Sequence, residues 1–172
     1  MDFIENTLDK KEELCNLLTN YSYEIHQKDD GEYRYLNDGD ICITVINTDD
    51  DNKKIYLDLQ EEFTLSFGSF HSHYESFQYS YDELVTDLKG ILENRIGAAS
   101  IYHHYEGKQN WLGSLMISIE EVETKTIKQV FHHVFHTKDF RNDLEQYGGE
   151  VWYEFWDSRY DKRIMIDKKI RG

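Results

Sequence analysis

The chain has 172 residues, a length that fits one domain with a sizeable core and no need of disulfide staples. Hydrophobic residues make up 39% of the chain and aromatic residues 15%, which excludes a disordered protein. The formal charge of −15 disfavours binding to nucleic acid or to an anionic membrane and predicts a basic protein partner, with solubility alone as the alternative explanation.

A helix and two strands are predicted in the first part of the chain. Apolar residues at helical spacing indicate a helix over residues 3–20. Tyr33–Leu36 and Ile41–Ile46 are expected to form strands around Asn37–Asp40, because Asp-Gly between apolar runs favours a hairpin turn. In residues 55–67 every odd position except Glu61 is apolar, which predicts one long strand or two strands with a bend at Gln60–Glu61.

A central helix is predicted over Ser80–Ile96. Ser80 and Glu83 match the S-x-x-E capping box, in which the two side chains satisfy free amide groups at a helix start. Gly97 is the expected C-terminal cap.

The last part of the chain is predicted to hold two hairpins and a short helix. These are Ala99–Tyr105 with Trp111–Ile119, Thr137–Tyr147 ended by Gly148, and Val151–Trp156 with Ile164–Ile166. Residues 126–136 fit both a helix and a strand, and their β-branched and aromatic content favours a strand. Strands in runs, broken by a few helices, indicate an α+β class with a mainly antiparallel sheet. Since no linker, proline or internal repeat occurs, residues 1–172 are expected to form a single domain.

The two cysteines and the N-terminal segment favour a cytoplasmic location. Cys15 and Cys42 both stand in apolar contexts and offer neither a disulfide framework nor a zinc-knuckle spacing, so buried thiols of a reduced compartment are expected. The segment MDFIENTLDK has neither a basic start nor an apolar run, and therefore does not resemble a signal peptide.

Seven of the eight histidines occur in clusters, and these are where a catalytic site would be sought: His71 and His73, His103 and His104, and His132, His133 and His136. On a strand, His71 and His73 would face the same side and could give one metal ion two ligands. The alternative function is therefore a zinc-dependent hydrolase that uses His71 and His73 with His103 or His132. Histidines scattered on a tyrosine-rich sheet, without a ligand, are the preferred explanation.

Aromatic residues indicate binding instead. Tyr74 lies beside the first histidine pair, and both faces of Val151–Trp156 are apolar. That strand is either covered on both faces, which core packing favours, or presents an adhesive surface, for which Trp and Tyr are the usual anchors. Complete nucleophile, P-loop and dinucleotide motifs are absent, so neither a catalytic residue nor a cofactor is predicted. The candidate binding residues are His71, His73, Tyr74, Trp152 and Trp156.

The stretch Glu62–Tyr74 resembles a segment of small, acidic, bacterial immunity-type proteins of toxin systems. In those proteins a strand ends in Phe-Gly and is followed by an aromatic residue, His-x-His, and Tyr or Phe. The resemblance implies a cytosolic α+β inhibitor that blocks a cognate toxin by surface contacts, without catalysis. Together with the charge, it predicts a protein-binding module, in its sharpest form an immunity-type inhibitor that neutralises a basic toxin.

Overall fold

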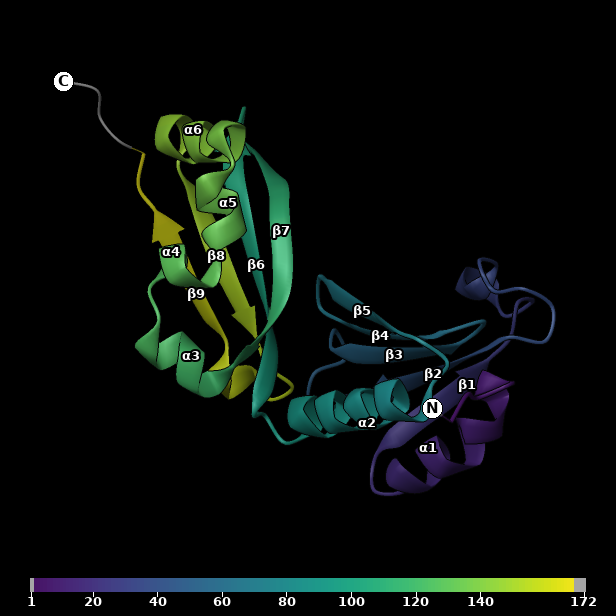
Figure 1. Ribbon diagram of the computed structural model, residues 1–172. Helices are drawn as coiled ribbons and strands as arrows, with labels where there is room; N and C mark the ends of the chain where they lie inside the picture. Colours follow the sequence, from purple (N-terminus) through teal and green to yellow (C-terminus); the bar gives the residue numbers. More distant parts are fainter. Residues whose placement is uncertain (1, 169–172) are drawn as a thin grey trace. The chain divides into compact units, whose positions relative to one another are not determined.

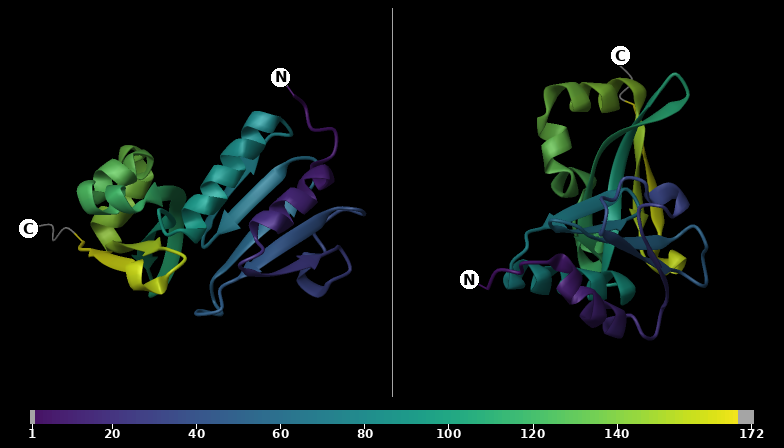
Figure 2. Two further views of the ribbon diagram at one scale, coloured as in Figure 1. Left: turned by 90° about the horizontal axis from the view of Figure 1, so that it is seen from below. Right: turned by 90° about the vertical axis from the view of Figure 1, so that its right-hand side faces the viewer.

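The computed structural model describes residues 2–168 and has two compact units, one up to Leu92 and the other from Glu93 onward. Each unit combines one antiparallel sheet with helices on one face of that sheet (Figures 1 and 2). The predicted α+β class with a mainly antiparallel sheet is therefore confirmed. The interpretation of residues 1–172 as a single domain stays a prediction.

The first unit is a five-stranded meander with strand order β1-β2-β3-β4-β5 and two α-helices on one face (Figure 1). In chain order its elements are a 3-10 turn at Thr7–Lys10, α1 (Lys11–Leu17), β1 (Ser22–His26), a 3-10 turn at Gly31–Tyr33, β2 (Ile41–Ile46), β3 (Lys54–Leu59), β4 (Phe63–Phe67), β5 (Phe70–Tyr74) and α2 (Gln78–Leu92).

Its core confirms the alternation seen in the sequence. Six odd-numbered side chains of β3 and β4 are fully or almost fully buried: Ile55, Leu57, Leu59, Phe63, Leu65 and Phe67. The chain turns between the strands at Gln60–Glu62, so the version with two strands and a bend is the correct one. The predicted N-terminal helix is confirmed in a shorter form, Thr7–Leu17.

The strand predicted at Tyr33–Leu36 is wrong. The strand that pairs with β2 is β1, with Ile25 opposite Ile43. Tyr33 and Tyr35 belong to a loop, and their hydroxyls bond Thr44 Oγ1 and Asp58 Oδ1, both at 2.9 Å. The alternation of Tyr33 and Tyr35 therefore comes from a loop that lies against the sheet. Such a loop can have the same period of two as a strand.

The central helix is confirmed, but its predicted ends are wrong. The amide of Tyr81 donates to the carbonyl of Phe77, so the first turn begins before Ser80, which is buried inside the helix. Gly97 lies in the following strand and not at a helix end. A Cβ at this position would lie 2.5 Å from the carbonyl oxygen of Glu154. The absence of a side chain at Gly97 therefore allows the neighbouring strand to approach closely.

The second unit has a four-stranded sheet with order β7-β6-β8-β9, and four short helices cover one face (Figures 1 and 2). Its elements are β6 (Ile96–Tyr105), β7 (Lys108–Ser118), α3 (Ile119–Thr124), α4 (Ile127–Val130), α5 (His132–His136), α6 (Lys138–Tyr147), β8 (Gly149–Glu154), a 3-10 turn at Ser158–Tyr160 and β9 (Lys162–Ile166). Both predicted hairpins and the predicted helix of residues 138–147 are present.

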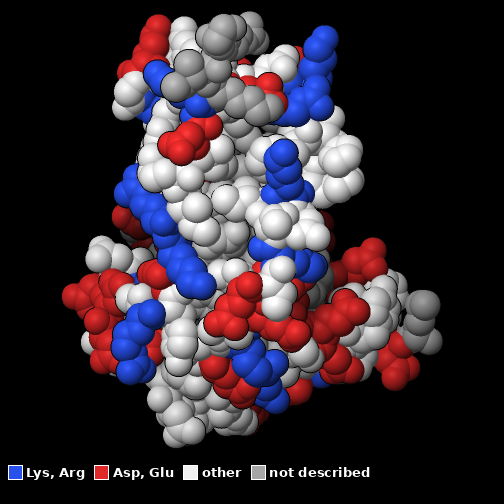
Figure 3. Space-filling model, turned by 90° about the vertical axis from the view of Figure 1, so that its left-hand side faces the viewer, with Lys and Arg blue, Asp and Glu red and all other residues white. Residues whose placement is uncertain are grey.

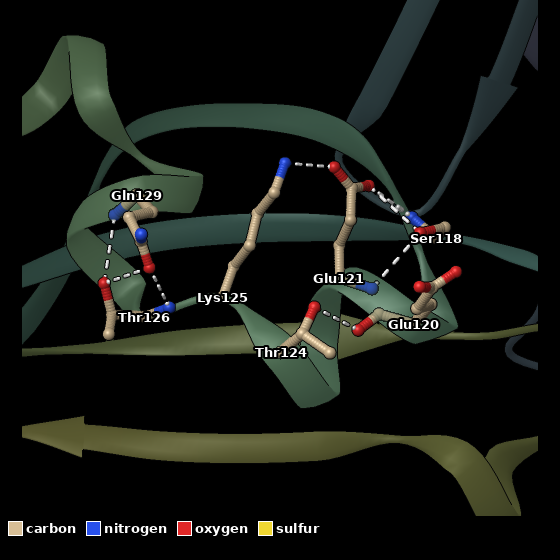
Figure 4. A network of polar contacts seen from close by, with 7 residues as sticks. All are labelled: Ser118, Glu120, Glu121, Thr124, Lys125, Thr126 and Gln129. Carbon is tan, nitrogen blue, oxygen red and sulfur yellow. Dashed lines mark hydrogen bonds and ion pairs between the residues drawn. The ribbon is translucent and has the colours of Figure 1, made fainter.

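The strand predicted for residues 126–136 is wrong, because this segment forms α4 and α5. Two successive capping boxes start the helical region: Ser118 with Glu121, and Thr126 with Gln129 (Figure 4). In each, the hydroxyl accepts from the third amide of the helix while the longer side chain accepts from the cap's own amide. Phe131 and Val134 then bury their side chains against the sheet.

We expect Ser118→Ala to lower the free energy of unfolding of the second unit by about 1 kcal/mol, because an N-cap hydroxyl bond is lost. Thr124→Ala is the matched control. Its hydroxyl bonds only the carbonyl of Glu120 within the same helix, so its loss should change stability by less than about 0.5 kcal/mol (Figure 4). Urea unfolding followed by tryptophan fluorescence measures this unit selectively, since all three tryptophans lie in it. Equal effects of the two substitutions would contradict the capping role.

The formal charge divides unevenly between the units. Residues 1–92 contain 21 Asp and Glu against 7 Lys and Arg, a net charge of −14, whereas residues 93–172 contain 13 against 12, a net charge of −1. In the upper part of Figure 3 the second unit presents many uncharged side chains, with Lys and Arg as well as Asp and Glu among them. The acidity of the protein is thus a property of its first unit.

Candidate functional site

His71 and His73 lie on β5 and share the exposed face of the first sheet, as expected for H-x-H on a strand. Their ring centroids are 5.4 Å apart. Nδ1 of His73 is 2.8 Å from Oε1 of Glu62 and 3.2 Å from Oγ1 of Thr64. Tyr74 points to the opposite face, where it is buried and donates to Asp87 of α2 at 2.7 Å. The histidine pair and Tyr74 therefore do not form one surface.

A row of polar side chains crosses this face of the sheet from strand to strand, and the loop with Tyr33 and Tyr35 lies against part of it. Direct neighbours in the register are His26, Cys42, Asp58, Thr64 and His73. Burial, together with the neighbouring Asp58 carboxylate, raises the pKa of Cys42 to about 12. The buried thiol is thus protonated at neutral pH and is no nucleophile. Cys15, also a free thiol, is only half-buried, which differs from the expectation.

The remaining histidines of the zinc alternative lie in the second unit. His103 is on β6, with its ring centroid 6.1 Å from that of Tyr147, and His132 on α5 stacks on His136 at 3.8 Å. Within residues 2–168, no group of three or more His, Cys, Asp or Glu side chains is arranged to hold a metal ion. The zinc alternative stays a prediction.

A second polar cluster, which the sequence did not reveal, lies on the sheet of the second unit. Glu150 of β8 is completely buried although it stands on the face opposite to α3–α6. Its Oε1 accepts from Gln109 Nε2 and lies 2.8 Å from His104 Nε2, while its Oε2 accepts from Arg163 Nε. The four side chains come from four different strands or strand ends, so the sheet register alone brings them together.

The electrostatics of Glu150 favour its charged form. Desolvation by burial raises the pKa of its carboxyl, but the hydrogen bonds from Arg163, His104 and Gln109 outweigh this effect and lower the pKa to about 2. The carboxylate is thus charged at neutral pH, and its hydrogen bonds hold the surrounding donor side chains in place.

Two glycines place Glu150 in this position. Gly148, with φ of +72°, ends α6, and its amide donates to the carbonyl of Leu144. At Gly149 a Cβ would lie 2.2 Å from the carbonyl oxygen of Tyr102 and 2.7 Å from Leu144. Only a chain without side chains at both positions can leave the helix and enter the sheet directly beside β6.

Aromatic and thioether side chains surround the carboxylate. Trp152 stands opposite Arg163 in the register, with the guanidinium 4.9 Å from its ring centroid, and its ring centroid is 5.6 Å from that of Tyr102. Trp111 is 59% exposed and Met165 58% exposed. We call this set, Tyr102, Trp111, Trp152 and Met165 around Glu150 and Arg163, the aromatic face.

The two faces of Val151–Trp156 differ in burial. Val151, Tyr153 and Phe155 are buried in the core against α3–α6, whereas Trp152 belongs to the aromatic face and is only half-buried. Trp156 is buried, with 8% of its surface exposed. Trp111, Arg163 and Glu150 were not identified as a group from the sequence, because they lie on three different strands. Only the inward–outward alternation of each strand indicates that they share a face.

Comparisons of the chain with protein-family models, with curated proteins and with solved structures gave no match. None of the helices within residues 2–168 has the length and the apolar character that crossing a membrane requires.

Proposed function

We propose that this protein is a protein-binding module, in its sharpest form an immunity-type inhibitor that neutralises a basic toxin by surface contacts. The observation that carries the proposal is the aromatic face. It combines exposed Trp and Met with Tyr and Arg, which are the residue types enriched at the centre of protein interfaces.

Rigidity supports the assignment of binding to this face. Glu150 holds Arg163, and Arg163 lies over the ring of Trp152, so the side chains that would meet a partner are ordered before binding. Side chains that are already fixed lose less conformational entropy on association, and this favours tight binding.

The charge supports a basic partner. With a net charge of −14, the first unit attracts a cationic protein over long distances and raises the association rate. A first test is to isolate the tagged protein from its native cells, identify what remains bound, and reconstitute the complex from purified components. The proposal requires a defined complex whose association rate falls as ionic strength rises.

Two triple variants with the same change in net charge show whether the first unit in particular attracts the partner. Asp29→Asn, Glu32→Gln and Asp49→Asn together remove three exposed charges from the first unit, and Glu106→Gln, Glu120→Gln and Glu123→Gln remove three from the second. We expect the first triple variant to associate with the partner several-fold more slowly at low salt, and the second to show a smaller effect. A salt-independent association rate, or a purified protein that retains no partner, would contradict the proposal.

A further inference from the structure

The outer edge of β7 differs from the other sheet edges in the described part of the chain. β7 and β9 are the edge strands of the four-stranded sheet, and β1 and β5 those of the five-stranded sheet (Figure 1). β1, β5 and β9 have five residues each, whereas β7 has eleven. Within residues 2–168, β7 pairs with β6 alone, so its backbone N–H and C=O groups that point away from β6 can accept a further strand.

β7 also lacks most of the features by which proteins prevent pairing at a sheet edge. Edge strands are usually short, or they carry charged residues or proline. β9 carries Lys162 and Arg163, and β1 carries Glu24. In β7 the only charged residue is Lys108 at the first position, and the whole chain contains no proline. β7 is therefore the edge that is most open to a further strand.

A β-bulge divides β7 and leaves one regular stretch. The register shifts between Ile101 and Tyr102 of β6, where Leu112 is the extra residue of β7. Gly113–Ser118 then pairs with β6 without interruption and has no charged side chain. We call Gly113–Ser118 the β7 edge. Its length is that of an ordinary strand, which is enough to align a second strand beside it.

The side chains of the β7 edge divide between the two faces of the sheet. Leu115 and Ile117 pack in the core beneath the helices. Ser114 and Met116 alternate with them and share the face of Trp111, whose Nε1 donates to Ser114 Oγ. The β7 edge therefore borders the aromatic face, and a strand added here would extend that face. Its side chains beside Trp111 and Met116 would be apolar or cationic.

Charge selects the occupant of the β7 edge. A second copy of the chain would bring another net charge of −15 close by, which opposes self-association, whereas a basic protein is attracted. At the opposite edge, Lys162 and Arg163 of β9 would repel a basic strand. We infer that the basic partner adds an extended segment of its own chain to the β7 edge and binds by backbone hydrogen bonds beside the aromatic face. This inference rests on the proposed function and specifies how the partner binds.

Backbone amide exchange distinguishes an added strand from a contact made by side chains alone. The isotope-labelled full chain is measured by NMR alone and when saturated with the purified partner from the isolation described above. In the free protein, amides of the β7 edge that bond to β6 are protected and alternate with unprotected ones. We expect the partner to slow the exchange of these unprotected, alternate amides at least about 100-fold. The amides of β9 are the control and should not change.

A lysine placed at either edge of the sheet gives a second, independent measurement. Leu115 and Ile164 are both partly exposed apolar residues on the helix-covered side, the first at the β7 edge and the second on β9. We expect Leu115→Lys to weaken partner binding at least about tenfold, because the new charge lies beside a basic strand. Ile164→Lys is the matched control and should leave the affinity within about twofold. Amide spectra verify that both variants fold, and the exchange experiment itself needs no substitution.

The possible outcomes separate this inference from the proposed function. A complex in which the β7 edge gains no alternate protection, or in which Ile164→Lys weakens binding and a folded Leu115→Lys does not, would overturn strand addition and leave the proposed function standing. Protection that appears in the protein alone as its concentration rises would show pairing between two copies and would also overturn the inference. If the purified protein retains no partner, the proposed function fails and the inference fails with it.

Discussion

Replacing Arg163 by methionine is expected to lower the free energy of unfolding of the second unit by about 3 kcal/mol, because it leaves the buried carboxylate of Glu150 without its counter-charge. Methionine keeps much of the contact with Trp152 but removes the charge that balances Glu150. The carboxylate then remains buried with only the bonds from His104 and Gln109. Tryptophan fluorescence during urea unfolding measures the loss.

Removing the carboxylate of Glu150 should lower the free energy of unfolding less than removing the guanidinium of Arg163. In Glu150→Gln the guanidinium of Arg163, whose side chain is 57% exposed, can be hydrated by solvent, and the amide oxygen still accepts hydrogen bonds. We therefore expect Glu150→Gln to destabilise less than Arg163→Met, and the double variant to lose less than the sum of the two. Lys162→Met, also an exposed cation on β9, is the matched control and should shift stability by less than about 0.5 kcal/mol.

The pH dependence of this cluster follows from the lowered pKa of Glu150. A carboxyl whose pKa falls from the ordinary 4.5 to about 2 on folding contributes stability that is fully present above pH 4.5 and is lost as the pH falls through about 2. The difference in unfolding free energy between the natural protein and Glu150→Gln should therefore shrink between pH 4.5 and 2. A constant difference over this range, or an Arg163→Met variant as stable as Lys162→Met, would show that the cluster does not stabilise the fold.

Trp111→Ala is expected to weaken binding of the protein partner at least about 30-fold, which corresponds to the roughly 2 kcal/mol that defines a hot-spot residue. The indole is held in place by a bond from Nε1 to Ser114 Oγ at 2.7 Å, yet 59% of the residue is exposed. Its loss should hence change the affinity far more than the stability of the free protein. Calorimetry with the purified partner and urea unfolding of the free variant separate the two effects.

Tyr105→Ala provides the comparison for this test. Tyr105 is an exposed aromatic residue of the same unit, but its ring contacts that of Tyr147 on α6, away from the aromatic face. We expect its loss to leave the affinity within about twofold of the natural protein, as for residues outside an interface centre. If Tyr105→Ala weakens the complex and Trp111→Ala does not, the partner binds elsewhere and the aromatic face is not the binding surface.

The strongest sequence signals were local and periodic, and these predicted the structure well. The odd-numbered apolar residues of β3 and β4 are buried, and the exception at Glu61 marks the bend between them. The errors came where one local signal had two explanations. Tyr33 and Tyr35 alternate like a strand but cover the sheet from a loop, and Ser80 with Glu83 matched a capping box inside a helix. The boxes at Ser118 and Thr126 were readable in the sequence and would have indicated helices after each.

By itself, the sequence determined the fold class, the positions of most strands and the acidity of the protein, because hydrophobic period and net charge depend only on residues near one another or on their sum. The tertiary structure decided which side chains meet. The hydrogen-bond partners of Glu150 are 13, 41 and 46 positions away in the sequence. Neither the distances between these side chains nor their burial can be predicted without the sheet register. A register shift of one residue in a strand would turn its side chains to the opposite face, so the aromatic face depends on how the strands pair.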